Sequence, residues 1–203
     1  MSVVAKPPSR PLQLRGEPAP LHGGPLVLLR FMRRHGMLNL KYGRLILRWA
    51  WLKLRWRGRL QTDGLCFVGP GVTFEIGRDA VVRLGRWSWI GHGTKIRAHE
   101  GEVSIGRECI VADRVMLIDF DHGVVETERP IRVQGIYKRD VRVGSNCWIG
   151  YGACILRGVT VGDNAIIGTS TVVTKDVPAN AVAGGVPARI LRMRDEPETL
   201  RWT

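Results

Sequence analysis

One histidine, His122, is the residue of this 203-residue chain best suited to chemistry, because it stands beside two carboxylates. It ends the run Asp119-Phe120-Asp121-His122 and is followed by Gly123. A histidine side chain ordinarily has a pKa near neutrality, so it can take a proton from a hydroxyl group and later return it. Either aspartate could orient the imidazole or hold a second substrate. The run predicts a general base, and the alternative is an ordinary surface histidine beside acids.

The elements that would position this histidine follow from a regular spacing of aliphatic residues. Six of them lie six residues apart: Val143, Ile149, Ile155, Val161, Ile167 and Val173. Neither an α-helix, with period 3.6, nor a strand, with period 2, needs this spacing. These six residues form two successive groups of three, here called trios. Glycine follows the first two members of each trio but not the third, so the full repeat is eighteen residues with three sides. Such a chain winds into a triangular prism, and each coil buries its core only by stacking on the next.

Two insertions interrupt this repeat at equivalent places. Earlier trios occur at Leu84, Ile90 and Ile96, and at Ile105, Val111 and Leu117. After each of these trios the next one starts late, by three residues in the first case and by twenty in the second. Both insertions therefore leave the same corner of successive coils, which stack about 4.8 Å apart. His99 lies in the short insertion and His122 in the long one, about residues 119–140, so we expect the two histidines to lie at one corner.

The net charge of +13 is carried almost entirely by the start of the chain. Residues 1–60 hold 13 Lys and Arg and one acid, whereas the remainder holds 18 basic and 17 acidic residues. A nucleic-acid-binding domain would carry a basic stripe on its folded body. We therefore expect no nucleic-acid partner.

The four cysteines favour a reducing, cytoplasmic location. Cys66, Cys109, Cys147 and Cys154 form no CxxC pair and lack the spacing of a small secreted domain. Residues 1–25 are rich in proline and contain no apolar run, so we expect no signal peptide. No stretch of about eighteen uncharged apolar residues is present, which predicts no membrane span.

The chain is expected to have four parts. They are a flexible tail (1–24), a basic amphipathic helical segment (25–58), the β-solenoid (59–187) and a C-terminal cap (188–203). The cap is predicted to contain a short helix at about Ala188–Arg194.

The basic segment is predicted to contain two helices, Leu26–His35 and about Asn39–Leu54. One face of the second helix is apolar and the opposite face is basic: Leu45, Trp49, Leu52 and Trp56 against Arg44, Arg48 and Arg55. Residues 52–57 also alternate with period two, so the end of this helix could instead be the first strand. Such a helix either lies in a membrane surface or packs on the end of the solenoid, and the sequence leaves both open.

The second half of the solenoid resembles a known family. The stretches that carry the resemblance are Asn146-Cys147-Trp148-Ile149-Gly150, Gly158-Val159-Thr160-Val161-Gly162-Asp163-Asn164, Val173-Thr174-Lys175-Asp176-Val177-Pro178 and Gly185-Val186-Pro187-Ala188-Arg189. With the six-residue spacing, they resemble the hexapeptide-repeat acyltransferases, above all the maltose/galactoside and capsular-polysaccharide O-acetyltransferases. The resemblance implies an all-β fold, a left-handed parallel β-helix of hexapeptide repeats.

The same resemblance implies a base, a co-substrate and an assembly. His122 matches the family's catalytic histidine, and Trp148 matches a tryptophan beside the thioester of coenzyme A. The other matches along the coenzyme A groove are Tyr151, Thr169, Thr174, Lys175, Arg189 and Arg192. Backbone N–H groups near Gly150 are candidates to stabilise an oxyanion. The implied partners are acetyl-CoA or another short acyl-CoA, a sugar or glycan acceptor, no metal, and two further copies of the chain in a homotrimer.

The chain departs in two places from the enzymes that act on small soluble sugars. Gly123 follows the histidine where those enzymes usually have proline, and the N-terminal segment is basic rather than acidic. These departures leave the acceptor open, and the basic amphipathic segment favours a lipid-linked or polymeric glycan at the inner face of the membrane.

Three other functions fit the sequence less well. An N-acetyltransferase of an amino sugar or antibiotic would use the same histidine. A zinc enzyme of the γ-carbonic-anhydrase type needs three histidine ligands, but His92 falls on a different side of the prism from His99 and His122. A non-catalytic scaffold would not need the residues that match the family's coenzyme A groove.

Overall fold

The structure is a computed structural model that describes residues 30, 33, 34, 36 and 39–194. Three expectations lie outside this range: the tail at 1–24, most of the helix at Leu26–His35, and residues 195–203. The chain divides into two compact units, of which Asn39–Thr203 holds the helix and strands described below.

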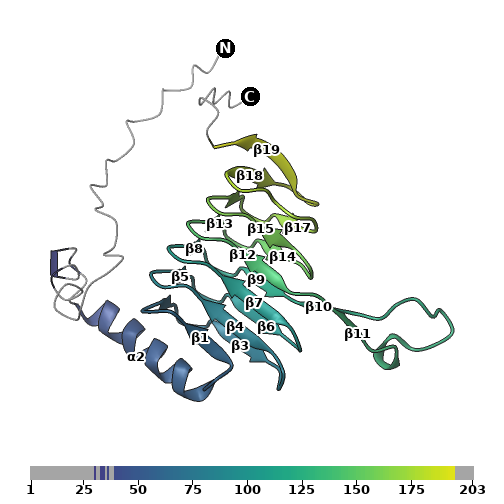
Figure 1. The fold of residues 1–203 in the computed structure, drawn as a ribbon, viewed down its shortest axis with the longest axis horizontal. Helices are drawn as coiled ribbons and strands as arrows, with labels where there is room; N and C mark the ends of the chain where they lie inside the picture. Colours follow the sequence, from purple (N-terminus) through teal and green to yellow (C-terminus); the bar gives the residue numbers. More distant parts are fainter. Residues whose placement is uncertain (1–29, 31–32, 35, 37–38, 195–203) are drawn as a thin grey trace, which may run out of the picture. The chain divides into compact units, whose positions relative to one another are not determined.

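Three sheets of short strands form the three faces of a triangular solenoid (Figure 1). Face A contains β1 (Leu60–Thr62), β4 (Val81–Leu84), β7 (Glu102–Ile105), β12 (Val141–Val143) and β15 (Thr160–Val161). Face B contains β2 (Phe67–Val68), β5 (Trp89–Ile90), β8 (Ile110–Val111), β13 (Trp148–Ile149), β16 (Ile166–Ile167), β18 (Ala181–Gly184) and β19 (Arg189–Met193). Face C contains β3 (Thr73–Ile76), β6 (Lys95–Ala98), β9 (Met116–Ile118), β14 (Cys154–Ile155) and β17 (Val172–Val173). The chain visits faces A, B and C in turn, so three successive strands make one coil.

Strand register confirms the eighteen-residue repeat. Ile149 pairs with Ile167 on one side and with Val111 on the other, all in parallel strands of face B. The inward side chains of the repeat are buried, with Ile149, Ile155 and Ile167 each 0% exposed. The core is thus a column in which each of these large aliphatic side chains is accompanied by a buried side chain two residues earlier, such as Ala153 before Ile155 and Ala165 before Ile167.

Tight corners between the faces explain the glycines that follow the inward residues. At Gly144, a Cβ atom would lie 2.7 Å from the backbone nitrogen of Asp163 in the next coil. Two residues on, Asn146 adopts a positive φ of 55°, and its side-chain amide donates to Asn164 of the next coil over 2.8 Å. The corners therefore stack as closely as the strands do.

The helix α2 (Leu40–Arg55) covers the first coil, close to the predicted range. Asn39 caps it by accepting a hydrogen bond from the backbone N–H of Tyr42 over 3.2 Å. Leu45 and Leu52 are buried, and α2 contacts β1 and β2. The apolar face therefore packs on the solenoid, and the alternative that residues 52–57 begin the first strand is wrong.

The C-terminal helix expected at Ala188–Arg194 is absent, and β19 takes its place. After a turn at residues 185–188, the chain reverses and β19 pairs antiparallel with β18. The last coil would otherwise leave a row of unpaired N–H and C=O groups at the edge of face B. Pairing with that edge outweighs the helical preference of a short, isolated segment.

A matched pair of leucines tests whether stability rests on the inward column. Leu117 is 0% exposed in β9, whereas Leu47 on α2 is 72% exposed. Leu117→Ala should lower the free energy of unfolding by about 2–5 kcal/mol, because it leaves a cavity. Leu47→Ala should change it by less than about 0.5 kcal/mol. Urea unfolding measures both, and equal losses would contradict the assigned core.

Candidate functional site

Both insertions leave the solenoid at the corner between faces C and A, as the repeat predicts. The short one follows β6, and the long one follows β9 and forms an arm. In the arm, β10 (Phe120–His122) pairs antiparallel with β11 (Ile136–Lys138), and the 3₁₀ helix η1 (Ile131–Val133) lies between them in the chain. The arm projects well beyond the body of the solenoid (Figure 1). This geometry presents the arm to solvent or to another molecule.

Phe120 joins the two histidines at the root of the arm. Its ring centroid lies 5.4 Å from that of His99 and 6.3 Å from that of His122. Both pairs are tilted or edge-on, the arrangement that aromatic rings favour. The expectation that His99 and His122 lie at one corner is confirmed. His122 is exposed, so its imidazole is accessible to a substrate.

The two aspartates beside His122 have different surroundings. Asp119 is 0% exposed, and its carboxylate accepts hydrogen bonds from the backbone N–H groups of His99 at 2.9 Å and Gly101 at 3.1 Å. Asp121 is exposed and pairs with Arg157, with 2.8 Å between the guanidinium Nε and the carboxylate oxygen. Asp119 thus holds the short insertion in place, and its burial excludes it from contact with an acceptor.

Arg157 and Phe120 are site residues that the sequence analysis did not assign. Arg157 follows Ile155, the third inward residue of its coil, and therefore sits at the corner between faces C and A, one coil after the arm. The pairing of β14 with β9 stacks the corner that holds Arg157 on the root of the arm, so the repeat alone could have predicted its contact with Asp121. Lys138, on β11, pairs with Glu100 of the short insertion and ties the arm to that loop.

The residues matched to the coenzyme A groove occupy two regions. Trp148 lies on the outside of face B and is 53% exposed. Gly150, Tyr151 and Thr169 follow at the corner between faces B and C, whereas Thr174 and Lys175 lie at the corner between faces C and A.

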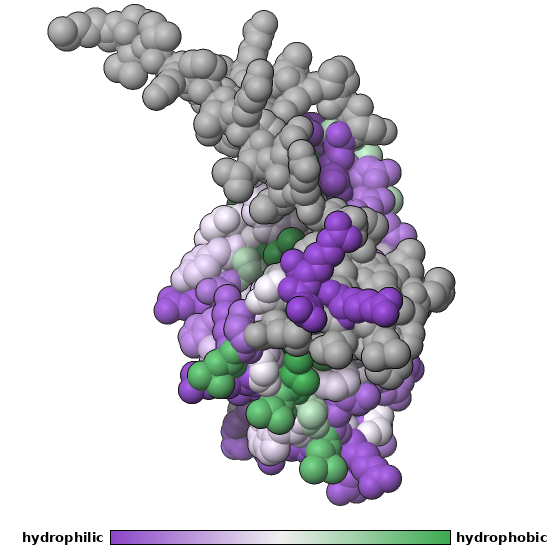
Figure 2. Space-filling model, turned by 90° about the vertical axis from the view of Figure 1, so that its left-hand side faces the viewer, coloured by the Kyte–Doolittle hydropathy of each residue, from purple (hydrophilic) through white to green (hydrophobic). Residues whose placement is uncertain are grey.

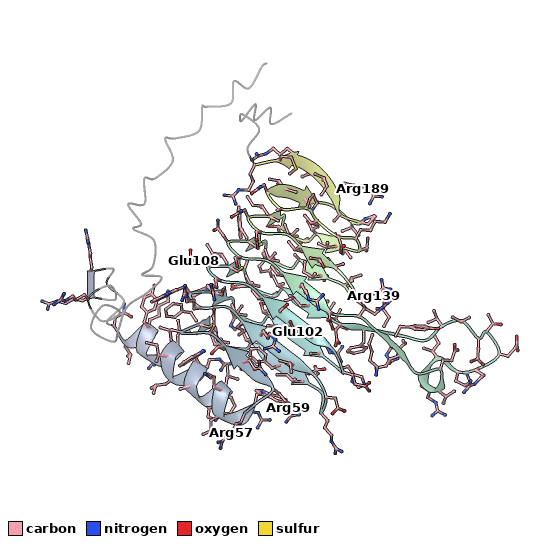
Figure 3. All side chains as sticks on the ribbon, in the orientation of Figure 1. Arg57, Arg59, Glu102, Glu108, Arg139 and Arg189 are labelled. Atoms are coloured by element: carbon pink, nitrogen blue, oxygen red, sulfur yellow. The ribbon has the colours of Figure 1, made fainter. Side chains whose placement is uncertain are left out.

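Lys175 and Arg189 are brought together. They line one open groove of about 380 Å³ between the last corner of the solenoid and β19. Figure 3 shows Arg189 and Arg139 on the side of the solenoid from which the arm projects. Arg192 also lies on β19, with its guanidinium donating to the carbonyl of Met193. The groove offers fixed cations of the kind that bind phosphate.

His122 and Trp148 are not brought together within one chain. His122 stands at the corner between faces C and A, and face B is the side of the prism opposite that corner. The same order places His92 at the corner between faces B and C, away from His99. In the described part of the chain, no group of three histidine, cysteine or acidic residues has the geometry of a metal site.

The cysteines are structural. Burial raises the pKa of the Cys66 thiol to about 12. A hydrogen bond with Cys147, together with burial, raises the pKa of Cys109. All four cysteines are free thiols, and Cys66, Cys109 and Cys147 are buried along the inside of face B. A buried thiol with a raised pKa is a poor nucleophile, so no covalent role follows for Cys66 or Cys109.

The different surroundings of the two aspartates can be tested with one substitution at each. Asp119→Asn leaves a backbone N–H facing an NH₂ group, so it should cost about 1–3 kcal/mol of unfolding free energy. Asp121→Asn breaks an exposed ion pair and should cost less than about 1 kcal/mol. Urea unfolding gives both values, and amide hydrogen exchange at residues 99–101 should rise only in Asp119→Asn. Equal effects would contradict the positioning role of Asp119.

Comparison with known proteins agrees with this geometry. Residues 140–175 match the family described as bacterial transferase hexapeptide (six repeats). A probable acetyltransferase of Mycobacterium tuberculosis is 34% identical over 66% of this chain and 51% of its own length. The galactoside O-acetyltransferase of Escherichia coli is 36% identical over 62% of this chain and 60% of its own length. The chain thus spans about half to three fifths of these two relatives.

A solved structure extends the likeness to the fold. It is a galactoside acetyltransferase in complex with coenzyme A, with a TM-score of 0.61 and 28% identity, and it covers 78% of this chain and 84% of its own. By its repeat, its sequence relatives and its three-sided fold, the chain is a left-handed parallel β-helix of the hexapeptide-repeat type, similar to the galactoside acetyltransferases.

Proposed function

We propose that the protein transfers an acetyl group, or another short acyl group, from acyl-CoA to a hydroxyl group of a sugar or glycan. The observation that carries this proposal is the exposed His122 at the root of the arm, in a chain similar to a galactoside acetyltransferase that binds coenzyme A. A reaction of this type needs one base and one groove for a long co-substrate, and the chain offers both.

The proposed reaction is direct transfer with His122 as general base. Its imidazole removes the acceptor hydroxyl proton as the oxygen attacks the thioester carbonyl. Backbone N–H groups near Gly150 stabilise the negative oxygen of the tetrahedral intermediate. The C–S bond then breaks, and the imidazolium returns its proton to the departing thiolate. No covalent enzyme intermediate is needed, because both substrates are held together.

The donor is proposed to lie along the outer surface of the later coils. Lys175 and Arg189 line one groove and supply positive charge for the phosphates of coenzyme A. Trp148 offers an exposed flat surface beside which the thioester end fits. Tyr151, Thr169, Thr174 and Arg192 are proposed to complete this site.

We further propose that the active site forms between subunits of a homotrimer. The base and Trp148 lie on different sides of one prism, so a single chain cannot apply both to one thioester. The projecting arm, with Tyr137 exposed on β11, is the element that can reach a neighbouring copy. Cyclic symmetry would then give three equivalent sites.

The acceptor is proposed to be a glycan, and the location cytoplasmic. The acceptor assignment rests on the likeness to galactoside O-acetyltransferase. Free, buried cysteines are compatible with a reducing compartment. The proposed reaction does not depend on membrane contact through residues 25–58. Within that range, α2 and the turn that follows it are described continuously by the structure.

Substitution of the base tests the reaction. His122→Asn should lower kcat by at least about 10²-fold in an assay of acceptor-dependent thiol release, because no other group replaces the base. The Kd of coenzyme A, measured by calorimetry, should stay close to the wild-type value. His92→Asn, at another corner, is the matched control and should keep activity. An active His122→Asn protein would refute the proposed base, and a protein that binds no coenzyme A would instead support a scaffold.

Mixed trimers test the site between subunits. Chains carrying His122→Ala and chains carrying Trp148→Ala should each be nearly inactive alone. Random mixing by co-expression should restore about a quarter of wild-type activity, because one interface in four pairs an intact base with an intact tryptophan. Failure to recover activity in verified mixed trimers would show that both residues must come from the same chain.

A further inference from the structure

The helix α2 carries a second apolar face that the solenoid does not cover. Leu40, Leu47 and Leu54 are 70%, 72% and 72% exposed, and Trp51 is 53% exposed. Their spacing of seven, four and three residues places all four along one line of an α-helix. Leu45 and Leu52, which pack on the first coil, lie on the other side. The helix therefore has one buried apolar face and one free one.

These four residues, which we call the outer stripe, form a continuous surface feature. Figure 2, which views the molecule from the left-hand side of Figure 1, shows apolar side chains gathered low on the described surface, where α2 lies. Sixteen residues of helix extend for about 24 Å. Scattered exposed leucines are ordinary, but an aligned row of three leucines and a tryptophan indicates a contact surface.

The charge of α2 identifies the kind of surface that would match it. The helix contains five basic residues and no acid: Lys41, Arg44, Arg48, Lys53 and Arg55. None of the ion pairs found among residues 39–194 involves α2. By helical geometry, Arg44 and Arg55 flank one edge of the outer stripe. An apolar stripe bordered by uncompensated positive charge is complementary to a surface with apolar and anionic parts.

We propose that α2 binds an anionic membrane surface through the outer stripe. The helix lies flat, with the outer stripe at the boundary between headgroups and acyl chains and with Arg44 and Arg55 at the lipid phosphates. Within the described residues, no helix is long and apolar enough to cross a bilayer. In the proposed trimer, cyclic symmetry would place three copies of α2 at one level along the axis, which strengthens binding through multivalency.

Vesicle binding of the full chain tests this proposal. The protein should co-sediment with vesicles of phosphatidylglycerol and phosphatidylcholine, and far less with pure phosphatidylcholine. Added salt should weaken binding, because the basic side chains contribute through charge. Leu47→Glu should lower the partition constant at least about tenfold, because it puts a charge in the centre of the stripe.

Leu191→Glu is the matched control, since Leu191 is 67% exposed on β19 at the last coil, whereas α2 covers the first coil. It should bind vesicles like the wild type, and thermal unfolding should show that both variants remain folded. The proposal is overturned if the wild type binds no anionic vesicles, or if both variants bind equally. It is also overturned if Leu47→Glu leaves vesicle binding intact but changes the oligomeric mass, since the stripe would then be a contact between copies.

Discussion

Stacking of one coil on the next is the interaction on which this structure depends. A coil of eighteen residues encloses only about two small or aliphatic side chains per side, and its backbone groups pair with the coils before and after it. No coil is stable alone, so any insertion must leave the ladders and the corners intact. A loop can meet that condition only by starting and ending at one corner. Both departures from the repeat do so, and they meet there.

The scaffold therefore uses different residues for supporting the corner and for the proposed chemistry. Asp119 accepts hydrogen bonds from the short insertion inside the corner, while His122, three residues later, stands free on the arm. The tryptophan proposed to adjoin the thioester lies on the opposite face. A narrow prism has no internal cleft in which to collect these groups. The proposed reaction needs these groups together, so in this proposal the arm brings His122 to Trp148 of a neighbouring copy.

The sequence predicted those features that the repeat determines by itself. The faces, the inward column and the shared corner of His99 and His122 all follow from counting residues. The start of α2 followed from its own apolar spacing, whereas its end was left open by the sequence. Features set by contacts across the repeat were not predictable in this way. The fate of Ala188–Arg194 depended on a free sheet edge, and the role of Asp119 on which N–H groups lay nearby. The outer stripe was not predictable from spacing alone, because only the contacts of α2 with β1 and β2 distinguish its packed leucines from its exposed ones.

Because every coil adds the same height, distances along the axis of the solenoid come in equal steps. The root of the arm and the Lys175–Arg189 groove lie on the same side of the prism, two coils apart along the stack. Their separation along the axis is therefore a whole number of coil heights, about 10 Å here. Adding or removing eighteen residues would preserve every local contact while lengthening or shortening this interval by one step. In the proposed function, the interval between the base and the cations for the coenzyme A phosphates is thus set by a count of coils rather than by the shape of any one pocket.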